Sequence, residues 1–147
     1  MASLIYDRWQ IVWKELPVVI EGSDPEGVHD MRVASRRLRA AMDVSVDAFP
    51  SGWYRALHKK AKAITSELGL VRDCDVQIEY FQSIRDESDP GERPGIDLLI
   101  SRLMRDREAA RADMLAFLET LNSEGVREEV EKRFGPSHRT TNAENGT

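Results

Sequence analysis

Basic residues recur at helical spacing between positions 29 and 39, and they are the residues of this chain best suited to chemistry. On a helix, which turns about 100° per residue, four of them fall within roughly 80° of one another. This basic stripe consists of His29, Arg32, Arg36 and Arg39, with Arg37 on its flank. Planar guanidinium groups form paired hydrogen bonds with phosphate oxygens, and an imidazole can donate a further one. The stripe therefore predicts a binding face for a phosphate anion.

A second basic stripe is predicted on the next helical stretch. It contains Arg55, Lys59 and Lys62, and it continues through Ser66, Gly69 and Asp73. The short link between the two stretches favours adjacent helices, so the two stripes would lie side by side. The residue four positions after Arg32 is Arg36, where a helix selected only for stability would place an acid. A bound anion would supply the missing negative charge. The alternative interpretation is a solvated helix face, or one paired with the acid-rich last helix.

The chain has a negative net charge, but one segment of it is strongly positive. The chain has 147 residues and a formal net charge of −5, yet residues 29–62 contain eight Lys or Arg and three Asp or Glu, a local charge of +5. The local field decides where an anion docks. The chain contains no run of about 18 apolar residues, so we expect no membrane span. The N-terminus lacks a basic region followed by an apolar one, so we expect no secretory signal. Because the single Cys74 excludes an internal disulfide, we expect a reducing, cytoplasmic location.

Four helical stretches must position these stripes, and no strand pattern competes with them. They are expected at about residues 4–20, 25–49, 51–86 and 96–133, with a possible break in the last one at 122–125. Pro17 is expected to bend or end the first stretch, and Pro50 with Gly52 to separate the second from the third. Residues 1–135 then form one all-α domain, an antiparallel four-helix bundle with long helices. The polar residues 136–147 are expected to be a disordered tail.

Four residues of the third stretch are expected to have structural roles. Gly69 marks either a close approach of another group or a weak point of the helix. Asp75 falls on the apolar side, so we expect it to be buried beside a hydrogen-bonding partner. Arg72 and Asp73 are neighbours with opposite charge and are expected to form an ion pair.

The acids near the first stripe do not favour an enzyme. Hydrolysis of phosphoanhydrides usually requires a metal ion held by clustered carboxylates or histidines. His29 and Asp30 are adjacent and diverge by about 100° on a helix, and Asp73 and Asp75 diverge as well. We therefore expect a binding protein without a metal or cofactor, and a phosphohydrolase is the less favoured alternative.

Two further alternatives concern the partner. Base stacking on nucleic acid requires aromatic residues among the basic ones, but Trp9, Trp13 and Trp53 lie outside both stripes. Nucleic acid is therefore a weaker expectation than a simple phosphate polymer. A helical adapter that docks an acidic protein on its basic face remains the other alternative.

Two motifs resemble one family. Residues 29–39, HDMRVASRRLR, resemble the HxxRVxxRRLR signature of the CHAD domain, the conserved histidine α-helical domain, and residues 68–76, LGLVRDCDV, resemble its LGxxRDxDV signature. The resemblance implies an all-α fold and binding of inorganic polyphosphate. By motif position it assigns that binding to His29, Arg32, Arg36, Arg37, Arg39 and Arg72. The assignment of Arg55, Lys59 and Lys62 rests on the second stripe alone.

The chain departs from the family in length. A typical CHAD domain has two similar helical halves around a basic groove, and this sequence carries the motifs of the first half only. The resemblance therefore implies a half-length form. Closed two-fold pairing is the commonest way for a chain to complete such a site, so a homodimer is expected. A fragment that binds weakly is the alternative.

Overall fold

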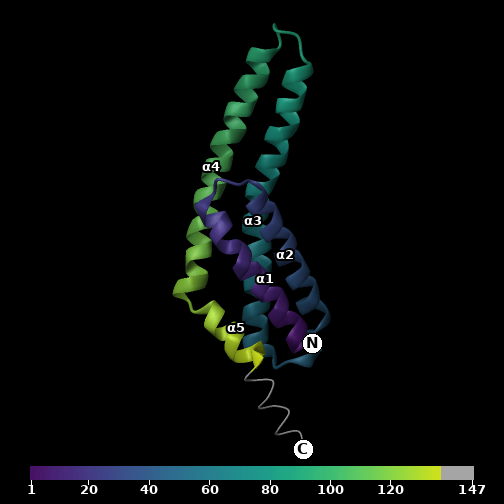
Figure 1. Ribbon diagram of the computed structural model, residues 1–147, viewed down its shortest axis with the longest axis vertical. Coiled ribbons are helices and arrows are strands. Elements are labelled where there is room, and N and C mark those ends of the chain that lie inside the picture. Colours follow the sequence, from purple (N-terminus) through teal and green to yellow (C-terminus); the bar gives the residue numbers. More distant parts are fainter. Residues whose placement is uncertain (137–147) are drawn as a thin grey trace, which may run out of the picture.

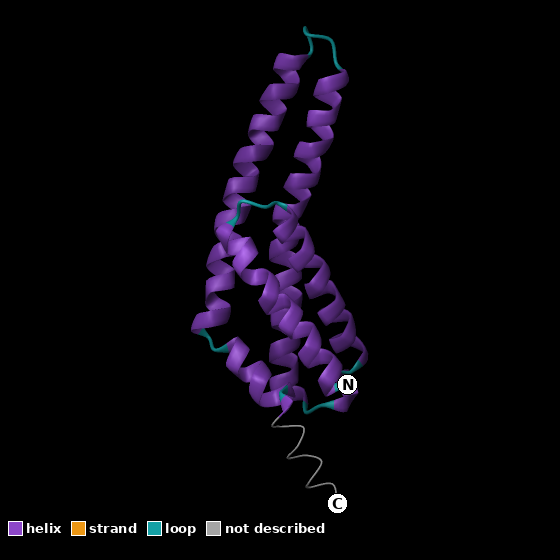
Figure 2. Ribbon diagram, viewed as in Figure 1, coloured by secondary structure: helices purple, strands orange, loops and turns teal. Residues whose placement is uncertain are grey.

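The computed structural model describes residues 1–136 of the chain, and all regular structure in that part is helical (Figures 1 and 2). The elements are α1 (Ala2–Glu21), α2 (Glu26–Val44), the short 3-10 helix η1 (Val46–Ala48), α3 (Ser51–Glu87), α4 (Arg93–Ser123) and α5 (Val126–Phe134). The predicted all-α class is confirmed. The predicted break at 122–125 is confirmed as well, so the last predicted stretch is two helices. The predicted tail lies outside the described residues, apart from Pro136.

One predicted helix end was right and one was wrong. α1 continues past Pro17, which does not end it, to Glu21, close to the predicted end at about residue 20, and closes on Gly22 at φ 82°. Pro17 itself is exposed, while Trp13 and Val19 on either side are buried and hold both turns against the core. The wrong end is that of α2, which was expected to reach residue 49 and ends at Val44.

At the end of α2, side-chain hydroxyl groups donate hydrogen bonds to its last carbonyl groups. The Tyr54 hydroxyl donates a hydrogen bond to the Met42 carbonyl at 2.6 Å, and the Ser45 hydroxyl donates to the Ala41 carbonyl at 2.8 Å. These bonds satisfy acceptors that a continuing helix would have paired with its own N–H groups. The chain then passes through η1 and the extended Phe49 to the start of α3.

Neighbouring helices in the sequence are neighbours in space. α2 packs against α1 and α3, α3 packs against α4, and α5 closes the lower end by packing on α1 and α4 (Figure 1). Apolar side chains at helical spacing fill the space between them, including the stacked rings of Trp9 and Trp13 and the buried Leu38 and Ile64. Burial of these stripes is the main force that fixes which helix faces meet.

The last half of α3 and the first half of α4 project beyond the other helices as a hairpin (Figure 1). A small separate core, built on Ile78, Ile100 and Leu103, holds the hairpin together. Several large apolar side chains on it remain exposed, and Tyr80 and Leu98 keep 61% and 56% of their surface. Within the described chain, no helix is both long enough and apolar enough to span a membrane.

Candidate phosphate-binding face

The contact between α2 and α3 determines what lies beside the first basic stripe. Ser35 and Thr65 are buried at this contact, and the Thr65 hydroxyl donates to the Ser35 oxygen at 3.0 Å. Further along, the imidazole of His58 lies 2.6 Å from an Asp43 carboxylate oxygen. Both pairs fit one antiparallel register. The helices therefore run side by side along the length of the predicted stripes.

Gly69 allows Arg32 to lie across α3. A methyl group at Gly69 would contact the Arg32 Nε atom at 3.4 Å, so the guanidinium passes directly over the glycine. The expected close approach at Gly69 is thus confirmed, and the approaching group is the arginine of the motif. The Arg32 Nε atom is buried and has no hydrogen-bond partner among the described residues. A buried donor of this kind costs stability unless a ligand or water satisfies it.

Three arginines of the first stripe surround a hollow at this contact. The hollow has a volume of about 390 Å³ and is lined by Arg32, Arg36, Arg39, Ala40, Asp43 and Thr65. None of the three arginines forms an ion pair with an acid of the described chain. The one acid in the lining, Asp43, is engaged by His58. We call this space the α2/α3 hollow, and its excess of positive charge favours an anion.

His29 and Arg37 lie toward α1 instead. They line a second hollow of about 500 Å³ between α1 and α2, with Arg8, Ile11, Glu15, Asp30, Val33 and Ala34. We call this space the α1/α2 hollow. The structure thus divides the predicted residues of α2 between its two flanks. Arg8 was not predicted from the sequence, because it lies outside the basic segment 29–62 and belongs to neither motif.

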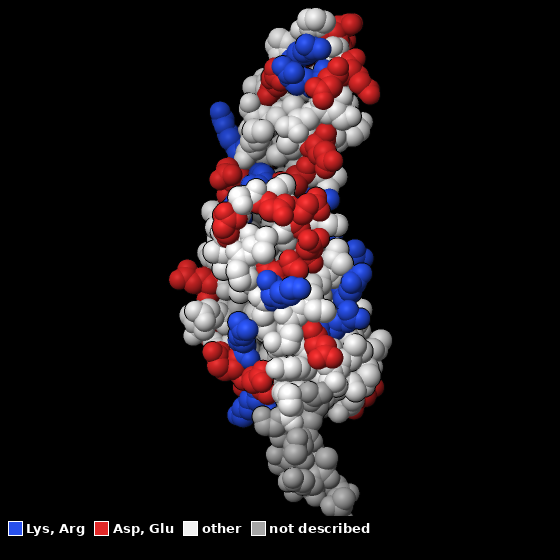
Figure 3. Space-filling model, viewed as in Figure 1, with Lys and Arg blue, Asp and Glu red and all other residues white. Residues whose placement is uncertain are grey.

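The predicted residues of α3 stand apart from both hollows. Arg55, Lys59 and Lys62 are exposed, Arg72 is half-buried, and none of them lines the α2/α3 or the α1/α2 hollow. The antiparallel register places Lys62 opposite Arg39, so it extends the positive surface beside the α2/α3 hollow. Figure 3 shows Lys and Arg side chains gathered along the outer side of α2.

The second motif connects α3 to α4. Asp75 forms an ion pair with Arg107 of α4, and both side chains are largely buried. The expectation of a hydrogen-bonding partner for Asp75 is confirmed. The expected ion pair between Arg72 and Asp73 was wrong, since no such pair occurs in the described chain and Asp73 points to solvent. Cys74, between these acids, is half-buried, and desolvation raises the pKa of its thiol, with Asp106, Asp75 and Asp73 adding to the effect.

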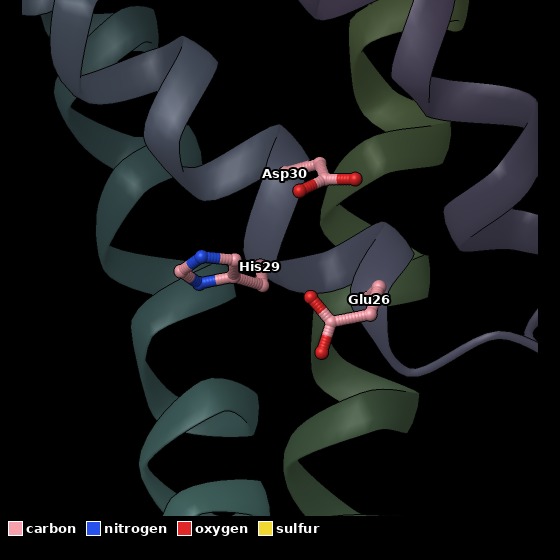
Figure 4. A group of neighbouring side chains, drawn as sticks. All are labelled: Glu26, His29 and Asp30. Carbon is pink, nitrogen blue, oxygen red and sulfur yellow. The ribbon is translucent and has the colours of Figure 1, made fainter.

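One group of potential metal ligands lies at the beginning of α2 (Figure 4). Glu26, His29 and Asp30 each offer an atom within 4.8 Å of the others. All three belong to the first turns of a single helix, and both acids are exposed. Such groups are common on helix surfaces without an ion, and we assign no metal to this one.

The comparisons with known proteins agree with the two sequence motifs. A family model described as CHAD domain matches residues 4–145 of the chain. No curated protein and no solved structure matches it.

Proposed function

The chain belongs to the CHAD domain family, and from this premise we propose that it binds inorganic polyphosphate, or a similar phosphate polyanion, through the arginine face of α2. One observation carries the proposal. Arg32, Arg36 and Arg39 surround the α2/α3 hollow, and no acid of the described chain forms an ion pair with any of them. The three arginines share the hollow with a single acid, Asp43, and this excess of positive charge favours a ligand that supplies negative charge.

The proposal is binding without catalysis. The polar groups that line the α2/α3 hollow are guanidinium donors, one threonine hydroxyl and the carboxylate of Asp43, which is held by His58. Cations and donors of this kind position phosphate groups, whereas hydrolysis also needs an activated water or another nucleophile. Incubation with polyphosphate should therefore release no more inorganic phosphate than a sample without protein.

A homodimer and the cytoplasmic location expected from the single cysteine complete the proposal. The dimer is supported by the exposed apolar side chains of the hairpin, among them Val76, Tyr80, Leu98 and Met104. Apolar surface of this kind is typical of protein contacts. Pairing of two copies would place two arginine faces in one assembly.

The test is a titration with long-chain polyphosphate at low and moderate salt. Two charge-assisted contacts are lost in the Arg32→Ala/Arg36→Ala double variant, so we expect its Kd to rise about a hundredfold or more. The matched control is Arg102→Ala/Arg105→Ala, which removes the same charge from exposed positions of α4. Circular dichroism melting verifies that both variants fold.

The outcomes separate the proposal from its alternatives. Binding that falls in the arginine-face variant and persists in the control supports a polyphosphate site on α2. Equal losses in both double variants would show a nonspecific charge effect. Tighter binding to an RNA of equal charge would favour a nucleic-acid interface, and no binding to either polymer would leave docking of an acidic protein.

A further inference from the structure

The basic surface continues across α2 from one flank to the other. Between the two hollows lies a third, of about 300 Å³, lined by Val33, Arg36, Arg37 and Ala40. It shares Val33 and Arg37 with the α1/α2 hollow and Arg36 and Ala40 with the α2/α3 hollow. The three hollows therefore adjoin one another across the exposed face of α2, and together we call them the cross-helix band.

Both small and large side chains line the band. Its floor includes Val33, Ala34 and Ala40 of α2, which leave the helix surface low. Arginines stand along it from one end to the other: Arg8, Arg37, Arg36, Arg32 and Arg39. An extended anion lying on this floor would meet guanidinium groups in succession.

Arg8 brings α1 into the band. It is half-buried, and neither Glu15 nor Asp30, which line the same hollow, approaches it within ion-pair distance. Its charge is therefore available to a ligand. The same two acids lower the positive potential at this end, so an anion gains less from the α1 end than from the α2/α3 hollow.

The ends of the band are farther apart than one phosphate group reaches. Arg8 lies on α1, whereas Arg39 lies on the flank of α2 that faces α3. A helix with its side chains is about 10–12 Å across, so a ligand that contacts both arginines must pass over α2 and span on the order of 10 Å. A short oligophosphate can occupy only one end, and the difference in acid content directs it to the α2/α3 hollow.

We propose that Arg8 is a contact for the far part of a linear polyphosphate, and that the cross-helix band favours chains long enough to cross α2. This inference rests on the proposed function and adds to it a residue of α1 and a preference for chain length. Each further phosphate contact also steepens the dependence of binding on salt.

The experiment compares Arg8→Ala with Arg105→Ala, which removes the same charge from an exposed position on α4. Each variant is titrated with long-chain polyphosphate and with tripolyphosphate at several salt concentrations. We expect Arg8→Ala to weaken long-chain binding about tenfold and to reduce the slope of log K against log salt by about one. The affinity of Arg8→Ala for tripolyphosphate should change by about twofold or less. The affinities of Arg105→Ala for both ligands should likewise change by about twofold or less.

Two further variants separate the effect of Arg8 on binding from effects on folding and from the proposed function itself. Arg8→Gln retains most of the aliphatic stem and serves if Arg8→Ala lowers the melting temperature. Arg36→Ala reports on the proposed function itself. If Arg8→Ala behaves like Arg105→Ala on long chains while Arg36→Ala weakens them, the band is overturned and the polyphosphate site stands. Equal loss of both ligands in Arg8→Ala overturns the length preference. Unchanged binding in Arg36→Ala contradicts the proposed function.

Discussion

Arginine side chains in this protein differ in what their guanidinium groups contact. Arg85 and Arg107 form ion pairs that hold α3 to α4, with Asp97 and Asp75 respectively. The arginines of the α2/α3 hollow have no such partner in the described chain, and the Nε atom of Arg32 is buried without a hydrogen bond. Paired arginines stabilise the packing of helices, whereas unpaired ones that share a hollow are available for an anion.

The reactivity of Cys74 depends on its burial and on the carboxylates around it. Partial burial and three nearby carboxylates disfavour the thiolate, so the pKa of the thiol is raised. The thiolate is the nucleophile, and we therefore expect slow alkylation by iodoacetamide near pH 8, with the rate rising at higher pH. The unfolded chain in urea is the control and should react severalfold faster. Equal rates for the folded and unfolded chains would contradict the burial of this thiol.

At the scale of elements, two glycines of the α1–α2–α3 layer allow close contacts of different kinds. At Gly27 of α2 an added methyl group would lie 2.9 Å from Val18 Cγ1 of α1 and 3.5 Å from its carbonyl carbon. At Gly69 of α3 it would meet only the Arg32 side chain, at 3.4 Å. The first contact is between a helix and a stiff β-branched residue, and the second involves a long flexible side chain.

These contacts predict opposite effects of the same substitution. Gly69→Ala should stabilise the fold by about 0.5–1 kcal/mol, because alanine loses less conformational freedom in a helix and its methyl group fits. Gly27→Ala should destabilise it by about 1 kcal/mol or more, because overpacking against Val18 outweighs that gain. Urea denaturation measures both. A shift of the midpoint in the same direction for the two variants would show that the contact at Val18 relaxes freely.

At the scale of the whole molecule, the projecting hairpin is the part least covered by the rest of the chain. Its own core is small, and apolar residues of both helices remain exposed around it. The bundle below it, by contrast, buries the large aromatic residues Trp9, Tyr54 and Phe134 completely or nearly so. A second copy that covers the hairpin would remove this surface from water, which is the basis of the proposed homodimer.

The proposed dimer predicts a specific effect at Tyr80. Tyrosine side chains at protein contacts often contribute about 2 kcal/mol, so Tyr80→Lys should weaken dimerisation at least tenfold. Val44→Lys adds the same charge at an exposed apolar residue of α2 and should leave the association unchanged. Light scattering over a range of protein concentrations measures the mass. A wild-type chain that is monomeric throughout, or equal masses for the two variants, would contradict pairing through the hairpin.

The sequence by itself determined the helical class and much of the helix pattern. The start of α3 at Ser51 and the break after Ser123 follow from Pro50 and Gly125, because such residues restrict or free the backbone wherever they occur. Pro17 shows the limit of local reasoning. Its effect on α1 depended on the packing of the buried residues around it, which no local preference specifies.

The same division applies to the candidate site. Arg32, Arg36 and Arg39 could be placed on one face from spacing alone, because the angle between residues is a property of the helix repeat. The groups that oppose this face were decided by tertiary structure: Gly69 beneath Arg32, and Arg8 on the other flank of α2. Which helix lies on each flank depends on how the apolar stripes of all the helices are buried together, and that is a property of the packed molecule.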